Sequence, residues 1–252
     1  IFMVNKKKLI NNNLLIILPH LDDEFAFAPL IHNLSKKKYK IFLIFCAERL
    51  VSNSLNKKSL NRRNESIKSI NILGINLKNV VYLNDHFIVD DRKLHLSAKN
   101  ISNFITKFIK EKKINKILTT SFEGGHPDHD SLALIVDKCK INKMFIPIYN
   151  SRKSLFLIPF SVMRPTKKQE HFFKTVAVGY LSWFSSLKIA FVYKSEFKAM
   201  IKLLPFILFK CIFSSKIYFT DQVSLESINY KKSLTYKRYN TDIDQLISKI
   251  FP

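Results

Sequence analysis

The first 150 residues alternate between short apolar runs and longer stretches in which apolar residues recur with helical spacing. The short runs are rich in β-branched and large apolar residues, which predicts strands, and the amphipathic stretches predict helices. Strands that alternate with helices are typical of a parallel sheet with helices on both faces. We therefore predict an α/β fold with strands near 14–18, 41–46, 80–83, 117–119 and 144–149 and helices near 24–35, 59–73, 97–112 and 130–139.

The pattern beyond residue 149 is less regular. A run within 171–184 fits a strand, and 186–213 has helical spacing. We expect that helix to end at Pro205, because an interior proline removes a backbone hydrogen bond. Its most apolar part, 203–209, is far too short to cross a bilayer.

Positive charge is concentrated in the C-terminal part of the chain. The formal net charge is +23, and between residues 138 and 220 there are 15 cations against two acids, Glu170 and Glu196. Such a field attracts phosphate-bearing partners, whether nucleic acid, anionic lipid or phosphorylated sugar, and does not choose among them. We predict one domain over 1–252, with a motif-bearing core at about 12–150 and a basic C-terminal portion at about 151–252.

Three scattered cysteines in apolar surroundings, Cys46, Cys139 and Cys211, predict reduced thiols, not a disulfide framework or a Cys-rich zinc site. The N-terminal segment does not have the form of a signal peptide. These features predict a cytoplasmic protein. The basic C-terminal portion adds the hypothesis of peripheral contact with the inner membrane leaflet.

Histidines and carboxylates directly follow two of the predicted strands. The segment "PHLDDE" (19–24) ends the first strand, and "EGGHPDHD" (123–130) follows the fourth. Because ligands bind at the carboxyl ends of the strands in open parallel sheets, both clusters are expected at one edge, where they can converge on one metal ion. The side chains concerned are His20, Asp22, Asp23, His126, Asp128, His129 and Asp130.

These residue types favour zinc or a similar ion. Two imidazoles and one carboxylate leave a fourth position for water, which is the arrangement of a catalytic site. A metal ion lowers the pKa of its water, and a neighbouring carboxylate that is not a ligand must accept the proton. The adjacent pair Asp22 and Asp23 can supply both carboxylate roles, since neighbouring side chains at a strand-to-helix turn point in different directions.

Each cluster alone has a simpler interpretation. Asp22, Asp23 and Glu24 fit an N-cap and first-turn acids that complement a helix dipole. The second segment fits a turn followed by a helix start, with Pro127 at the first helical position. Two such clusters at strand ends, about a hundred residues apart, favour the metal site over these local interpretations.

The same two segments resemble the signature motifs of the PIG-L/LmbE-like family of zinc-dependent de-N-acetylases, which remove acetyl groups from N-acetylated sugars. Weaker similarity lies in "RRNESIKSINILGI" (62–75), in "YLNDH" (82–86) and, later, in "KIAFVYKSE" (188–196). The resemblance covers about 12–140 and extends thinly to 196. It implies a Rossmann-like three-layer αβα fold with a mostly parallel sheet.

Carried over to this sequence, the resemblance implies a role for each matching residue. His20, Asp23 and His129 would bind one Zn²⁺ ion, although other divalent metals fit the same ligands. Asp22 would be the general base, and His126 would stabilise the oxyanion or protonate the leaving amine. Arg62 would hold the substrate side of the pocket, and Asp128 would orient a metal-site histidine.

The sequence departs from the family pattern at Leu21, where proline is common, and at "FAFAPL" (25–30), where glycines are usual. The second departure alters the packing near the substrate pocket and leaves the chemistry intact. We therefore predict a metal-dependent hydrolase that removes the N-acetyl group from an amino sugar, which a phosphate or lipid can carry. The alternatives are a metallo-deacylase for a non-sugar amide, and a basic nucleic-acid-binding protein with a vestigial site, which the absence of a recognisable nucleic-acid module disfavours.

Overall fold

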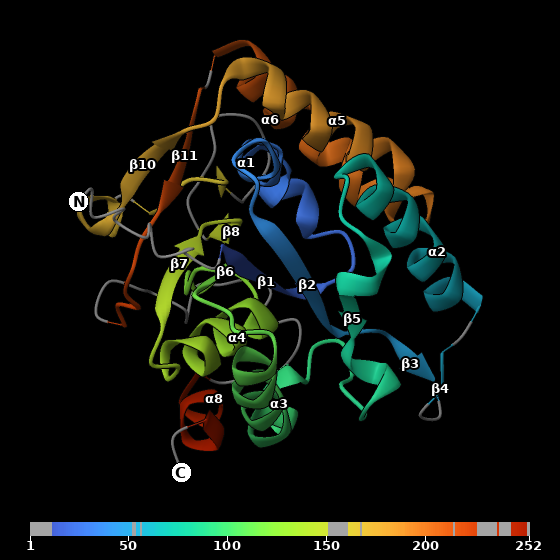
Figure 1. Ribbon diagram of the computed structural model, residues 1–252, viewed down its shortest axis with the longest axis vertical. Coiled ribbons are helices and arrows are strands. Elements are labelled where there is room, and N and C mark those ends of the chain that lie inside the picture. Colours follow the sequence, from blue (N-terminus) through green and yellow to red (C-terminus); the bar gives the residue numbers. More distant parts are fainter. Residues whose placement is uncertain are drawn as a thin grey trace, which may run out of the picture.

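A computed structural model describes residues 12–51, 54–55, 57–150, 161–166, 168–213, 215–225, 236 and 243–250. Its centre is a sheet of five parallel strands in the order β5-β2-β1-β6-β7 (Figure 1). These strands are β1 (Asn13–His20), β2 (Lys40–Ala47), β5 (Val80–Tyr82), β6 (Lys116–Thr120) and β7 (Asn142–Ile146). The helices between them are α1 (Glu24–Lys36), α2 (Lys57–Ile72), α3 (Ala98–Glu111) and α4 (Pro127–Asp137).

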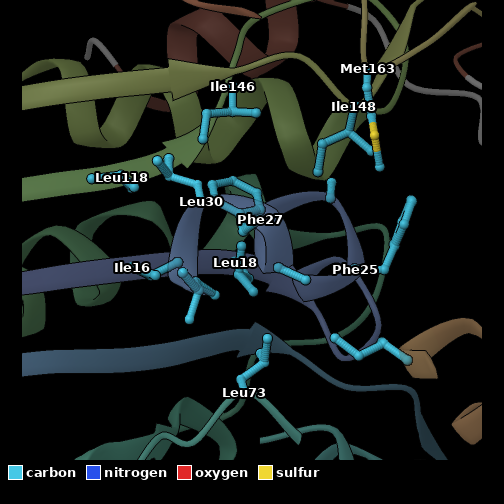
Figure 2. Close-up of a cluster of buried hydrophobic side chains, with 14 of the residues drawn as sticks. Ile16, Leu18, Phe25, Phe27, Leu30, Leu73, Leu118, Ile146, Ile148 and Met163 are labelled. Carbon is cyan, nitrogen blue, oxygen red and sulfur yellow. The ribbon is translucent and has the colours of Figure 1, made fainter. Parts of the chain in front are cut away.

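Residues of β1 alternate between two hydrophobic cores, one on each face of the sheet. Leu14, Ile16 and Leu18 join a core formed with α1 and the end of α2 (Figure 2). Leu15 and Ile17 join a second core formed with α3, α4 and α8 (Ile243–Ile250). A strand buried on both faces is typical of a sheet between two helical layers. The predicted Rossmann-like αβα architecture is therefore confirmed.

Two predicted boundaries within the first 150 residues were wrong. The strand expected at 144–149 ends at Ile146, because Pro147 has no N–H for the ladder, and the chain enters a short separate strand, β8 (Tyr149–Asn150). The helix expected at 130–139 begins earlier, at Pro127, where a proline at the first helical position gives up no intrahelical bond.

The C-terminal portion adds a strand pair and a helical pair. The strand expected within 171–184 is β10 (Lys174–Ala177), which pairs with β11 (Lys216–Phe219) in antiparallel fashion. The single helix expected from residue 186 to Pro205 is instead two helices, α5 (Trp183–Val192) and α6 (Phe197–Phe213). The break lies at 193–196, and α6 continues through Pro205. The prediction of a stop at Pro205 was therefore wrong.

Contacts with the rest of the fold explain this break. The hydroxyl of Tyr193 donates to Glu24 on α1, and the backbone N–H of Ser195 donates to Glu65 on α2 over 3.0 Å. These bonds hold the chain in the short turn η6 (Lys194–Glu196) between the helices. Figure 1 shows α5 and α6 as a pair outside α1. Among the residues that the structure describes, no helix combines the length and hydropathy needed to cross a bilayer.

Candidate active site

The first strand delivers His20 and Asp23 to the carboxyl edge of the sheet. His20 is the last residue of β1, and Asp23 precedes α1 at its N-cap position. The Asp23 carboxylate makes no capping hydrogen bond to α1. Instead, its Oδ2 accepts the backbone N–H of His20 over 3.1 Å and lies 3.2 Å from His20 Nδ1. The simple capping interpretation is therefore wrong for this side chain.

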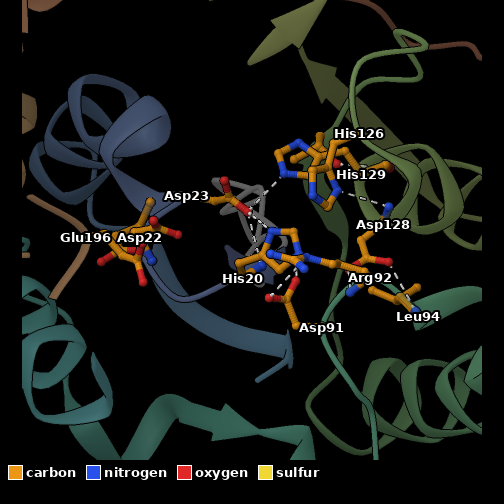
Figure 3. Close-up of polar contacts among 12 residues, drawn as sticks. His20, Asp22, Asp23, Asp91, Arg92, Leu94, His126, Asp128, His129 and Glu196 are labelled. Carbon is orange, nitrogen blue, oxygen red and sulfur yellow. Dashed lines mark hydrogen bonds and ion pairs between the residues drawn. The ribbon is translucent and has the colours of Figure 1, made fainter. Parts of the chain in front are cut away.

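The second motif places three more side chains at the same carboxyl edge of the sheet. β6 lies beside β1, and six residues separate the end of β6 from the start of α4. His126 caps α4, and its Nδ1 accepts the backbone N–H of Asp128 over 3.2 Å. His129, in the first turn of α4, places Nε2 3.3 Å from Asp23 Oδ2. The interpretation of this segment as a helix start is correct for the backbone, and the same start aims the imidazoles at β1 (Figure 3).

Asp128 is fully buried and contacts three groups. Its Oδ2 lies 2.9 Å from His20 Nε2 and accepts the backbone N–H of Arg92 over 2.5 Å. Its Oδ1 accepts the backbone N–H of Leu94 over 3.1 Å. Asp128 therefore joins the His20 imidazole to the segment that follows β5.

That segment contributes a residue that the sequence did not single out. Asp91 Oδ1 lies 3.3 Å from His20 Nε2. Its only sequence signal was the pair "DD" at 90–91, several residues beyond the end of β5. The separation from the strand end is why strand-end reasoning missed it.

Asp22 points away from the histidines. Its φ is +112°, a left-handed conformation that is strained for a residue with a side chain. Its backbone N–H donates to Glu24 over 3.0 Å, and its carboxylate accepts a bond of 2.6 Å from Arg62. Successive aspartates thus face opposite sides of one turn, as the sequence predicts, with Asp23 toward the imidazoles and Asp22 toward α2 (Figure 3).

The surroundings of Asp22 raise its pKa to about 7. Burial is the main cause, because it disfavours the charged carboxylate, and the charge of Asp23 adds to it. The Arg62 guanidinium opposes the shift. Asp22 is therefore a carboxyl group whose proton affinity suits exchange with water near neutral pH.

The pKa of the site's other acids and bases follows from the same contacts. Burial alone would lower the pKa of His20, but its bonds with Asp128, Asp23 and Asp91 hold that pKa well above its usual value. Burial would raise the pKa of Asp23, but His129 and His20 hold it well below the usual range. Burial and the neighbouring histidines lower the pKa of His126 to about 3, so its imidazole is neutral.

These residues line a pocket of about 200 Å³. Arg62 contributes to its wall and also lies 4.0 Å from Glu196, which pairs with Lys58 over 3.0 Å. Glu196 lies in η6, and no strand-end pattern could have indicated it. Every lining residue is ionisable: Asp22, Asp23, Asp91, Glu196, Arg49, Lys58, Arg62, Arg92, His20, His126 and His129. Such a wall suits a polar, hydroxyl-rich or anionic ligand.

The donor atoms fit a metal ion. Ligands at 2.0–2.1 Å in a tetrahedral zinc site are separated from one another by roughly 3.3–3.4 Å. Asp23 Oδ2 lies 3.2 Å from His20 Nδ1 and 3.3 Å from His129 Nε2, which matches two edges of such a tetrahedron. Ligand atoms of His20, His126 and His129 also lie within 4.8 Å of one another, and so do those of His20, Asp91 and Asp128. His126 and Asp91 therefore compete with Asp23 as ligands.

Two buried acids support the site from behind. Glu24 accepts a hydrogen bond from Tyr193 and holds the backbone of Asp22. Asp130 accepts the backbone N–H of Glu123 over 2.7 Å and the hydroxyl of Tyr236 over 2.6 Å. Both acids therefore fix the shape of a motif backbone.

Comparisons with known proteins identify the fold and the family of this chain. Structures with the same fold include an N,N'-diacetylchitobiose deacetylase from Pyrococcus horikoshii (16% identity, 82% of each chain, TM-score 0.57) and the A40926 pseudoaglycone deacetylase (16% identity, 83% of this chain and 96% of the other, TM-score 0.59). A third is the zinc inhibited form of teicoplanin deacetylase (15% identity, 73% and 84%, TM-score 0.53). At such identities the likeness establishes the fold. A search of curated protein sequences finds no match. The sequence profile of the GlcNAc-PI de-N-acetylase family, PIG-L, matches residues 15–140, half of the chain, and the chain belongs to this family of de-N-acetylases.

Proposed function

We propose that this protein is a metal-dependent hydrolase that removes the N-acetyl group from an N-acetylated amino sugar. The observation that carries the proposal is the position of Asp23 Oδ2, at ligand-edge distances from both His20 Nδ1 and His129 Nε2. Membership of the PIG-L family and the all-ionisable pocket beside these atoms support it.

In this proposal His20, Asp23 and His129 hold the ion. When bound, zinc or a similar divalent ion acidifies a water molecule and polarises the amide carbonyl. Asp128 accepts from His20 Nε2 and so fixes the ring with Nδ1 toward Asp23, the tautomer that a ligand needs. Because a teicoplanin deacetylase was solved in a zinc inhibited form, metals other than zinc belong in every test.

Asp22 is the proposed general base. Its carboxylate lies in the pocket wall beside the proposed ligand Asp23, and Arg62 holds it over 2.6 Å. Asp22 takes a proton from the attacking water as oxygen bonds to the amide carbon. It then returns the proton to the departing nitrogen, so that acetate and a free amine are formed.

His126 is proposed to stabilise the oxyanion. Its Nδ1 already accepts a backbone N–H, so the proton of the neutral ring lies on Nε2, where it can donate to the developing negative oxygen. A second proton on Nδ1 would oppose the N–H of Asp128. This favours oxyanion stabilisation over protonation of the leaving amine, the other role that the family resemblance allowed.

Cations at the pocket support an anionic carrier on the sugar. Arg49, Lys58, Arg62 and Arg92 line it, and Arg49 and Lys58 are exposed. Guanidinium and ammonium groups bind phosphate oxygens well. We therefore propose an amino sugar linked to a phosphate or a phospholipid as substrate.

Acetate release tests the proposal. The metal-loaded protein is incubated with free, phosphate-linked and lipid-linked N-acetylhexosamines and with N-acetylated amines that carry no sugar. We expect equal amounts of acetate and free amine from the sugars, with phosphate-linked sugars turned over best. Release confined to the non-sugar amides would refute the sugar assignment and leave a metallo-deacylase.

A further inference from the structure

Helix α6 is apolar on two opposite sides. Its inner side, which includes Met200, Leu203 and Ile207, is buried against the rest of the fold. Its outer side carries Ile201, Leu208, Phe209, Ile212 and Phe213, each 46–66% exposed. With 3.6 residues per turn, these side chains and Pro205 lie within an arc of roughly 140° on the side opposite to the buried residues. A helix that is hydrophobic all round is normally buried.

Exposed apolar side chains are concentrated in this part of the chain. Of the 16 large hydrophobic residues that are exposed in the described structure, ten lie between residues 180 and 213, so this is not the usual scatter of single residues. Helix α5, which packs against α6, adds Phe184 and Phe191 at helical spacing. The rings of Phe209 and Phe213 lie 4.9 Å apart and form the apolar end of α6.

Lysines accompany these apolar residues without acidic partners. Lys198 and Lys202 lie on the outer arc of α6, and Lys188 lies between the exposed rings of α5. No described carboxylate forms an ion pair with any of the three. The nearest acid along the chain, Glu196, pairs with Lys58 in the pocket wall. The surface is therefore both apolar and positively charged.

Lys210, which directly follows the apolar run 203–209 in the sequence, does not belong to this surface. It is 4% exposed, and its ammonium lies 5.5 Å from the centre of the Trp183 ring. The charges of the outer side thus come from the first half of α6, and its second half is apolar.

We propose that the outer side of α6, together with the exposed side of α5, docks on an anionic phospholipid bilayer. Helices that lie in a membrane interface typically place lysines beside the phosphate headgroups and aromatic and aliphatic side chains a few ångströms deeper. A second copy of this chain fits poorly, because it would bring the same lysines together and each copy carries +23. The 17 residues of α6 span about 25 Å along the membrane plane.

The docking surface begins beside the pocket. Glu196, in the pocket wall, immediately precedes Phe197, the first residue of α6, which is 54% exposed. A bilayer under α6 would therefore hold its headgroups close to the pocket. This inference does not depend on the proposed reaction, since binding is measured without a substrate.

Co-sedimentation with vesicles tests the inference. We expect the protein to bind vesicles of phosphatidylcholine with about three-tenths phosphatidylglycerol, not phosphatidylcholine alone, and to be released by about 0.5 M salt. The double variant L208S/I212S keeps the charge and should bind at least about tenfold more weakly. The variant K198E/K202E should lose at least about 25-fold, since each lysine near an anionic bilayer contributes roughly fivefold.

Matched controls separate this surface from the general charge of the protein. L77S/L96S changes two equally exposed leucines elsewhere, and K99E/K107E makes the same charge change on α3. We expect both controls to bind within about threefold of the wild type, with unfolding temperatures of all variants unchanged. Equal losses in variants and controls, equal binding to both vesicle types, or no binding would overturn the inference. A dimer that L208S/I212S converts to a monomer would overturn it as well, by assigning the surface to a second copy.

Discussion

Asp128 offers a sharp test of how this site is held, because one carboxylate serves three donors. Replacement by asparagine preserves the size of the side chain but leaves a single acceptor oxygen and adds an NH2 group. If that oxygen stays at the Oδ2 position, it keeps His20 and the Arg92 N–H, and the NH2 group then opposes the Leu94 N–H. The opposite orientation loses two bonds and is worse.

The magnitude follows from the bonds that change. A buried N–H left without an acceptor costs about 1–3 kcal/mol in the free energy of unfolding. In addition, His20 loses a charged acceptor, and loss of such a partner typically lowers metal affinity about 10–100-fold. We therefore expect Asp128→Asn to remain folded at room temperature and to bind metal about 10–100 times more weakly.

The assay is metal titration against a chromophoric chelator, with chemical unfolding measured on the same preparations. Asp130→Asn is the matched control. Asp130 is also buried in α4 and also accepts backbone N–H groups, but its other partner is the Tyr236 hydroxyl, which can turn to accept from an amide. We expect the control to bind metal within about threefold of the wild type. An Asp128→Asn variant with unchanged metal affinity and only reduced stability would refute the orienting role and reduce Asp128 to a support for residues 92–94.

Two further predictions follow from the same geometry, and a third concerns the buried Lys210 of α6. Alanine at His20, Asp23 or His129 should abolish metal binding, measured by elemental analysis. His126→Ala should retain the metal and lose about 10²–10³ in kcat. If His126→Ala is metal-free, His126 belongs to the ligand set in place of Asp23. Asp22→Asn should keep the metal and lose about 10²–10⁴ in kcat, and near-normal turnover would exclude Asp22 as the base. Burial lowers the pKa of Lys210 to about 8, below the value of about 10.4 in an unfolded chain. Between these two pH values the unfolded state binds more protons than the folded state. The free energy of unfolding should therefore rise with pH from about 8 to about 10.4. Lys210→Met should abolish this rise and stabilise the protein at neutral pH by up to about 3 kcal/mol in urea unfolding, and the exposed control Lys202→Met should do neither.

The sheet was predictable because its signal is local. Alternating residues of β1 enter two cores, so the strand is apolar throughout, and the helices that cover it repeat with their own period. The motif residues could also be predicted, because they directly follow two strands that lie side by side in the sheet. His20 and His129 are more than a hundred positions apart in sequence, and strand order brings them together.

The rest depended on contacts between distant segments. Asp91 and Glu196 reach the pocket from irregular chain, where no period indicates direction. Tyr193 and Ser195 set the break between α5 and α6 by bonds to partners on α1 and α2. The sequence does not indicate this break, because the helices on both sides of it are strongly apolar. The burial of Lys210 was missed for a similar reason, because a lysine beside an apolar run looks like a solvated flank until its neighbours are known.

The most direct test of the proposed chemistry is a titration of the metal-free protein with zinc, cobalt or manganese while acetate release from an N-acetylated amino sugar phosphate is followed. The account predicts no release without metal and a rise that stops at one ion per chain. It also predicts no rise with Asp23→Ala at the same metal concentrations. Acetate release that is independent of added metal in a protein shown to be metal-free, or a full rise with Asp23→Ala, would contradict it.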